Sequence, residues 1–250
     1  MKKNLGLTLI EVVIATAILA AVLLIAFSVL WSTQSAYNEA AIAQDLEARG
    51  RTFVDAYKKD LSFARVTTIA ADGSSVRYQV PLSSQASGDL DYGYANQGVA
   101  IVGAECELAF VPTVLYAEGT TAPPPPAGAT SVALGGIDAN ADGDLSDVIA
   151  VGTVVKRIWS GAALLDSAAV SDQVALGYSG GSYAVDVDND GAADRLFTVL
   201  DASGNVVAAG MIASSGVKFR MTVWHGALSD LKTRFVLRRM SDEWVLKNDQ

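Results

Sequence analysis

An uncharged apolar run near the amino end constrains this chain more than any other feature. No residue from Val12 to Asn38 is charged, and the twenty positions from Val12 to Trp31 are almost all apolar. At a helical rise of about 1.5 Å per residue, a run of this length covers about 30 Å, the thickness of the hydrocarbon core of a bilayer. The run therefore predicts a transmembrane helix.

A single carboxylate, Glu11, stands at the head of this run. On insertion scales an acid costs roughly 2.5–3.5 kcal/mol at the centre of a membrane helix and less near an interface. An acid held in hydrocarbon is stable only with a partner, so Glu11 is a candidate functional residue. The spacing alone equally allows Glu11 to lie at the level of the lipid headgroups, beside Lys2 and Lys3.

The residues around Glu11 resemble the amino end of type IV pilins and type II secretion pseudopilins. The resemblance is carried by Lys2, Lys3, the segment Gly6-Leu7-Thr8-Leu9-Ile10-Glu11 and the apolar run after it. It implies that residues 1–6 are a leader peptide, which prepilin peptidase removes between Gly6 and Leu7 before the new amine is methylated. It also implies that Glu11 neutralises the terminal amine of a neighbouring subunit during filament assembly.

The same resemblance bears on the kind of subunit. Many type IV pilins carry a proline in the membrane half of this helix, whereas the first proline of this chain is Pro81. The missing proline and the large domain after the helix favour a minor pilin or a minor pseudopilin, similar to the J type. The partners implied are other pilin or pseudopilin subunits, prepilin peptidase, and inner-membrane lipid before assembly.

The charges that flank the apolar run predict its orientation. Lys2 and Lys3 precede it, and Glu39 is the first charged residue after it, so the amino end is expected to stay in the cytoplasm. This predicts a single-pass inner-membrane protein whose globular domain is periplasmic or extracellular, and which then enters a pilus or pseudopilus. Ordinary signal-peptide cleavage is the less favoured alternative, because the small-residue triplet Ala15-Thr16-Ala17 lies in the middle of the run.

Composition excludes several classes of function. A net charge of −9 argues against a surface that binds nucleic acid, since phosphates require clustered Lys and Arg. The only cysteine, Cys106, excludes an internal disulfide; it is either a bridge between subunits or, as we favour, a small buried apolar residue. The only histidine, His225, lacks a neighbouring nucleophile motif and is expected to be a surface or half-buried structural residue. The chain is therefore predicted not to be an enzyme.

The pattern after the membrane span predicts an α+β fold. Residues 7–31 form the membrane half of a long helix and residues 32–64 its amphipathic half. The second half carries an apolar stripe on which a domain can pack: Ile42, Leu46, Phe53, Tyr57 and Leu61. Residues 65–250 then form one β-rich globular domain with antiparallel hairpins.

Strands are expected where short runs rich in Val, Ile, Tyr and Thr alternate with turn residues. These runs are Val66–Ile69, Val76–Val80, Glu107–Val111, Val148–Val155, Tyr183–Val187, Leu196–Leu200, Val206–Ile212, Val217–Trp224 and Thr233–Arg239. Asp201–Asn205 is predicted to be a hairpin turn. Pro123–Pro126 predicts an extended surface connector, with recognition by a partner as the alternative.

Two acidic loops share the frame D-x-[DN]-x-D-G. Their candidate metal ligands are Asp138, Asn140, Asp142, Asp144 and Asp147 in the first loop, and Asp186, Asp188, Asp190 and Asp194 in the second. Oxygen side chains at positions one, three and five, with glycine at six, are typical of loops that bind calcium. Position twelve is Ile149 or Phe197, so neither loop has the bidentate Glu of an EF-hand, and Asp147 and Asp194 are the candidates to complete the coordination.

A structural calcium ion in one or both loops is the favoured interpretation, and the resemblance supports it, because calcium sites are known among pseudopilins. The alternative is that both segments are solvated, metal-free β-turns. Two hypotheses for function follow. The chain is either a structural filament subunit in which Glu11 sets the register, or a membrane-anchored calcium-dependent binding or adhesion module; a tethered hydrolase is a distant third.

Overall fold

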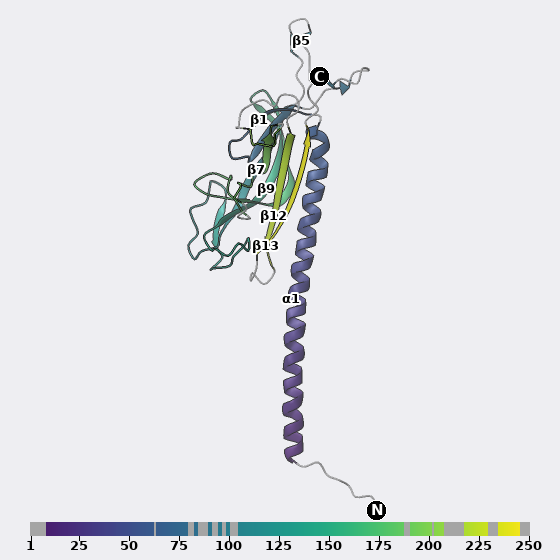
Figure 1. Cartoon of the computed structure of the whole chain (residues 1–250), viewed down its shortest axis with the longest axis vertical. Helices are drawn as coiled ribbons and strands as arrows, with labels where there is room; N and C mark the ends of the chain where they lie inside the picture. Colours follow the sequence, from purple (N-terminus) through teal and green to yellow (C-terminus); the bar gives the residue numbers. More distant parts are fainter. Residues whose placement is uncertain are drawn as a thin grey trace, which may run out of the picture. The chain divides into compact units, whose positions relative to one another are not determined.

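A computed structural model of the chain describes residues 9–62, 64–79, 83–84, 90–91, 95–96, 99–100, 105–187, 191–201, 203–207, 218–229 and 235–245. It separates into two units, Met1–Ala41 and Ile42–Gln250. A single helix, α1 (Leu9–Ser62), contributes to both units (Figure 1). The α+β class is confirmed; of the helix expected over residues 7–64, residues 7, 8 and 63 lie outside the described residues.

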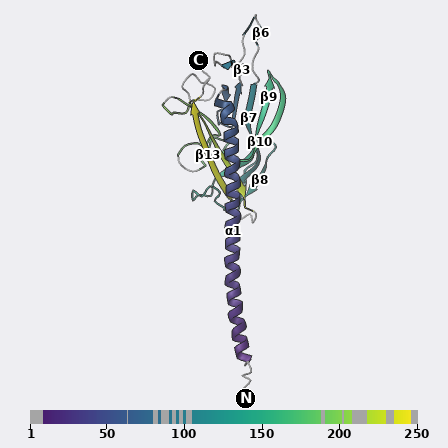
Figure 2. The same cartoon turned by 90° about the vertical axis from the view of Figure 1, so that its right-hand side faces the viewer.

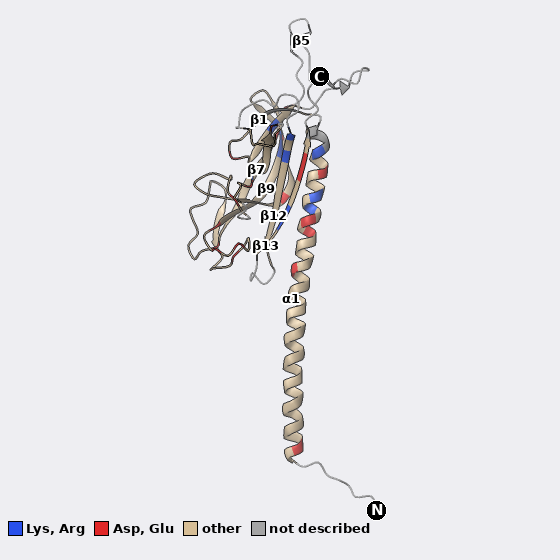
Figure 3. Cartoon of the chain, viewed as in Figure 1, with Lys and Arg blue, Asp and Glu red and all other residues tan. Residues whose placement is uncertain are grey.

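The part of α1 in the first unit has an apolar surface. Leu24 and Phe27 are 73% and 69% exposed. No residue from Val12 to Asn38 is charged, and the lower part of the helix is accordingly almost all tan in Figure 3. The hydroxyls of Thr16 and Ser28 donate to backbone carbonyls three residues earlier, so these polar groups are satisfied within the helix. Among the described residues, α1 is the one helix long and apolar enough to cross a membrane.

The second unit is built on one large sheet. Its strands are β1 (Arg65–Ile69), β2 (Ser75–Gln79), β7 (Glu105–Ala117), β8 (Thr130–Ala133), β9 (Val148–Ser160), β10 (Ala163–Gly177), β11 (Phe197–Leu200), β12 (Lys218–Leu228) and β13 (Phe235–Val245). They are ordered β1-β2-β7-β9-β10-β12-β11, with β13 paired to β12 and β8 to β7. All these pairings are antiparallel except β7 with β8.

Two short pairs stand outside this sheet among the described residues. They are β3 (Ser83–Ser84) with β4 (Leu90–Asp91), and β5 (Ala95–Asn96) with β6 (Val99–Ala100).

The later half of α1 packs on one face of the sheet (Figure 2). Of the predicted stripe, Leu46, Phe53, Tyr57 and Leu61 are buried, and Ile42 is partly buried in a smaller cluster with Ala43, Leu46 and Val236. Two ion pairs also join helix and sheet: Lys58 Nζ lies 2.7 Å from Asp242 on β13, and Arg49 Nη1 lies 2.6 Å from Asp172 on β10. The part of α1 from Ile42 onward is thus a layer of the domain.

Several expected strands differ from the observed ones. Strand β10 was not predicted, because much of it is polar or alanine-rich. Tyr183–Val187 is not a strand; only Val185 forms an isolated bridge, to Asp194. Of Val206–Ile212, only Val206 and Val207 are described, and Val206 forms an isolated bridge to Leu200. The Asp201–Asn205 turn is confirmed, since the Asp201 carboxylate accepts hydrogen bonds from the N–H groups of Ser203 and Asn205.

Candidate functional site

The first acidic loop connects β8 to β9, and its own carboxylates shape it. Asp138 accepts hydrogen bonds from the backbone N–H groups of Ala141, at 2.6 Å, and Gly143, at 3.0 Å. Ala141 and Gly143 both have positive φ angles, of 64° and 94°, so the chain bends sharply as the motif requires. Asp144 in turn accepts the N–H of Ser146 at 2.7 Å. The loop is therefore ordered by local side-chain to backbone hydrogen bonds.

Strand register brings a further acid to this loop. Ala117 on β7 pairs with Val148 on β9, so Glu118 and Asp147, the residues just beyond this pair, lie side by side. The N–H of Glu118 donates to the carbonyl of Asp147 at 3.0 Å, and the N–H of Asp147 donates to Glu118 Oε2 at 3.2 Å. Glu118 Oε1 accepts the N–H of Ala139 at 2.7 Å. Glu118 is fully buried and fixes both ends of the loop.

Three carboxylates converge at this point. Among the described residues, Glu118, Asp144 and Asp147 form a group whose ligand oxygens all lie within 4.8 Å of one another. Burial raises the pKa of the Glu118 carboxyl, and the charge of Asp147 adds to this. Burial, followed by the charges of Asp142 and Asp144, likewise raises the pKa of Asp147. A cation among these groups would relieve both effects, so the donor set fits a hard metal ion.

Glu118 is the member of this group that sequence reasoning missed. It lies outside the repeated acidic frame, directly after the apolar run of β7 and before Gly119. An acid at the end of an apolar strand, next to a glycine, was the only local signal. Asp138 and Asp142, which the frame did predict, are not members of the converging group.

Asn140 joins the first loop to the second. Its side-chain nitrogen lies 2.5 Å from Asp147 Oδ2, 3.1 Å from Asp142 Oδ2 and 2.7 Å from the carbonyl oxygen of Val187. Its side-chain oxygen accepts the N–H of Asp142 at 3.3 Å. Asn140 thus acts as a hydrogen-bond link in this arrangement.

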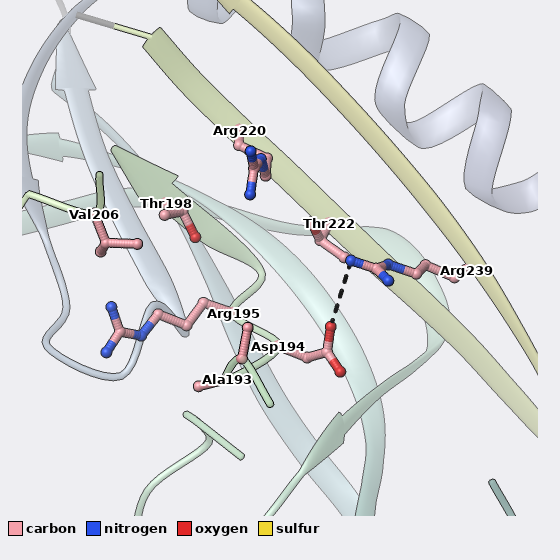
Figure 4. A pocket seen from close by; sticks show the side chains of 9 residues that line it. Ala193, Asp194, Arg195, Thr198, Val206, Arg220, Thr222 and Arg239 are labelled. Carbon is pink, nitrogen blue, oxygen red and sulfur yellow. Dashed lines mark ion pairs between the residues drawn. The ribbon is translucent and has the colours of Figure 1, made fainter. Parts of the chain in front are cut away.

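The second acidic loop is closed by two of its predicted residues. Asp186 Oδ2 accepts the N–H of Gly191 at 2.7 Å, and Asp194 Oδ2 accepts the N–H of Val187 at 2.9 Å. Asp194 is buried, and its Oδ1 lies 3.8 Å from Arg239 Nη2 on β13 (Figure 4). Asp188 and Asp190, the other predicted ligands, lie outside the described residues.

Of the predicted processing and assembly residues, Gly6 and Leu7 lie outside the described residues. Glu11 lies in the first turn of α1 and is exposed. A carboxylate in the first turn interacts favourably with the helix dipole.

The lone cysteine and the lone histidine are both in the core of the domain. Cys106 on β7 is 3% exposed, which agrees with its expected place as a small buried residue. His225 on β12 is fully buried instead of lying at the surface or half-buried, because its side chain is on the face of the sheet that α1 covers; a Cβ at Gly50 would lie 3.4 Å from His225 Nδ1. Ser171 Oγ lies 3.0 Å from His225 Nε2.

Comparison with known proteins gives one match, at the amino end. Residues 1–27 match the prokaryotic N-terminal methylation motif. No curated protein and no solved structure matches the chain. The matched motif supports the type IV pilin and pseudopilin class, whose members are structural and not enzymatic, with other pilin subunits and prepilin peptidase as partners. The apolar helix, which begins within this motif at Leu9, fits a membrane-anchored pilin.

Proposed function

We propose that this chain is a minor pseudopilin or minor pilin, a structural subunit of a type II secretion pseudopilus or a type IV pilus. In this proposal prepilin peptidase removes residues 1–6 between Gly6 and Leu7, residues 7–31 enter the filament core, residues 32–64 carry the domain, and residues 65–250 face outward. The observation that carries the proposal is a methylation motif that overlaps the start of an uncovered apolar helix with one acid at its head.

The exposed apolar surface of α1 requires a cover. Its side chains from Leu9 to Trp31 are exposed in the isolated chain, and water is an unfavourable solvent for a surface of this kind. Lipid covers it before assembly, and the same helices of neighbouring subunits cover it afterwards. Glu11 then needs a cation inside the filament, and the terminal amine of the next subunit is the group that supplies one.

The test is a pair of matched substitutions on the same helix. Glu11→Ala should abolish incorporation into the filament while membrane insertion continues, because the proposed intersubunit pair is lost and the apolar helix is kept. Glu39→Ala, the same change at the first acid beyond the apolar run, should assemble normally. Crosslinking of subunits in membranes and filament recovery measure assembly; fractionation measures insertion. If Glu11→Ala assembles as well as Glu39→Ala, the chain is better described as a membrane-anchored calcium-dependent binding or adhesion module.

We also propose that Glu118, Asp144 and Asp147 hold a structural calcium ion. The support is that a buried carboxylate and two acids of the adjoining loop meet at one point, where their charges repel each other. Calcium takes six to eight oxygens, so backbone carbonyls or waters would complete the shell. Affinity of about 10⁻⁴–10⁻³ M is expected, as in extracellular calcium modules.

Calorimetric titration of the full chain in detergent with calcium chloride tests this site. The unmodified protein should take up calcium, and Asp147→Asn should weaken its binding at least tenfold. Asp55→Asn removes the same charge from an exposed position on α1 and should leave binding unchanged. Equal calcium binding by Asp147→Asn and Asp55→Asn would contradict the proposed calcium site without affecting the filament proposal.

A further inference from the structure

The face of β12 that points away from α1 carries an arginine-lined cavity. Phe219, Met221 and Val223 turn toward the core and are fully buried, so Arg220 and Thr222 point to the opposite face. A cavity of about 560 Å³ lies there, and its polar lining consists of Asp194, Arg195, Thr198, Arg220, Thr222 and Arg239 (Figure 4). Its size falls in the range of cavities that hold small ligands.

Two of the three arginines already have anionic partners. The Nε and Nη2 atoms of Arg220 donate to Glu243 Oε2 at 3.2 and 3.0 Å. Arg239 lies 3.8 Å from Asp194 and stacks over the ring of Trp224, with the guanidinium carbon 5.6 Å from the ring centroid. Both guanidinium groups are therefore held in place.

Arg195 differs from Arg220 and Arg239 in its hydrogen bonding. Its Nε is buried and has no hydrogen-bond partner within the described part of the chain. Figure 4 shows the guanidinium groups of Arg195 and Arg239 on opposite sides of Asp194. A buried donor on a charged group is costly when unpaired, so Arg195 favours binding an acceptor at this cavity.

The charges around the cavity indicate that its ligand is an anion. The lining contains three arginines and one acid, Asp194, and a second acid, Glu243, lies beside it; this leaves an excess of one positive charge in a chain whose net charge is −9. The planar fork of a guanidinium matches a carboxylate with two parallel hydrogen bonds. We propose that this cavity binds a carboxylate group through Arg195. The carboxylate belongs either to a small molecule or to an acidic side chain of another polypeptide.

The test uses the full-length chain in detergent, with the Nε–H resonance of Arg195 followed by NMR. Malonate, added at constant ionic strength with chloride as the balancing ion, should shift this resonance and saturate. Arg195→Gln should weaken malonate binding at least tenfold, and Arg195→Lys, which keeps the charge but loses the fork, several-fold. Arg51→Gln, which removes an arginine that pairs with Glu47 on α1, should bind as the unmodified protein does.

A second titration identifies the source of the carboxylate. A synthetic peptide with the sequence of residues 138–147 that binds more tightly than malonate assigns the site to a polypeptide. Malonate that binds as tightly as the peptide, or more tightly, assigns it to a small molecule. The proposal is overturned if chloride alone reproduces the shift, if Arg195→Lys and Arg195→Gln bind malonate as the unmodified protein does, or if inorganic phosphate binds while malonate and the peptide do not.

Discussion

The side-chain nitrogen of Asn140 lies 2.7 Å from the carbonyl oxygen of Val187, 47 residues further along the chain, and this hydrogen bond joins the two acidic loops. Val187 is buried, so its carbonyl has no ready access to water as an alternative donor. The described parts of the two loops are therefore joined, and loss of this hydrogen bond should affect the stability of both.

Replacing Asn140 with alanine should destabilise the domain by about 1–3 kcal/mol, because the buried carbonyl of Val187 loses its donor. Denaturant unfolding of the full chain in detergent measures the change. Asn205→Ala, in the exposed Asp201–Asn205 turn, should cost less, about 0.5 kcal/mol or below. An equal loss of stability in the two variants would contradict a stabilising role for the hydrogen bond between Asn140 and Val187.

Calcium should stabilise the domain at neutral pH and have little effect near pH 4. The folded state raises the pKa of Glu118 and Asp147, so without metal their contribution to stability is present below their ordinary pKa values and is lost as pH rises through the folded values. Calcium reverses that loss where both groups are ionised. At about 5 mM, with a dissociation constant of about 0.5 mM, the gain is about 1.4 kcal/mol, or roughly 3–5 °C in melting temperature.

Melting curves at pH 4 and pH 7.5, with and without calcium, test this prediction. Asp147→Asn should lose the calcium-dependent increase at pH 7.5. An increase of the same size at both pH values, or one reproduced by sodium chloride at equal ionic strength, would speak against a carboxylate site.

His225 should make the domain less stable in mild acid. Burial, together with the charge of Arg49, lowers the pKa of His225 to about 4, against the opposing charges of Asp172 and Asp45. A lowered histidine pKa means that the unfolded chain binds a proton first, so stability falls as pH drops from the ordinary value of about 6.5 toward 4. Between pH 6.5 and 4.5 this histidine alone should remove about 2 kcal/mol.

Chemical denaturation of the unmodified protein and of His225→Gln at these two pH values isolates the effect. Glutamine fills a similar space and can still bond to Ser171, but it does not titrate. The pH dependence of the two proteins should differ by about 2 kcal/mol. Parallel pH profiles would mean that the imidazole is protonated as easily in the folded chain as in the unfolded one.

Gly50 should resist substitution although it lies in the middle of a helix. A Cβ at this position would lie 2.7 Å from Met240 Cγ on β13, so α1 and the sheet are close together at this residue without a side chain. Gly50→Ala should therefore destabilise the domain by about 1–3 kcal/mol, even though alanine favours a helix by about 1 kcal/mol. Adding Met240→Ala should recover part of the loss, because it removes the clashing atom. A Gly50→Ala protein more stable than the parent would contradict this contact.

The long helix and most of the sheet could be predicted because their signals are local. The apolar run and the stripe of Leu46, Phe53 and Tyr57 mark α1, and runs of β-branched residues mark β9 and β12. The full extent of β7 could not be predicted, because Pro112 interrupts the pattern. In the structure, a register shift between Pro112 and Val114 absorbs the proline.

The candidate metal site was only partly accessible from sequence for a related reason. The acidic frame marked Asp144 and Asp147, whose oxygens do converge, but the third member, Glu118, comes from another strand. Its place depends on the pairing of Ala117 with Val148, which is a property of the sheet register and not of any local motif. Likewise, nothing near Arg195 in the sequence indicates that Arg220 and Arg239 share its cavity.

Prepilin processing is the central claim, and the amino end of the mature protein tests it most directly. Intact-mass and amino-terminal analysis should be made of the chain isolated from its native membrane, with prepilin peptidase active or absent. We predict a mature chain that starts at N-methylated Leu7 only when the peptidase is active. A chain that starts at Met1 or near Val22 whether or not the peptidase is present would contradict the filament-subunit account.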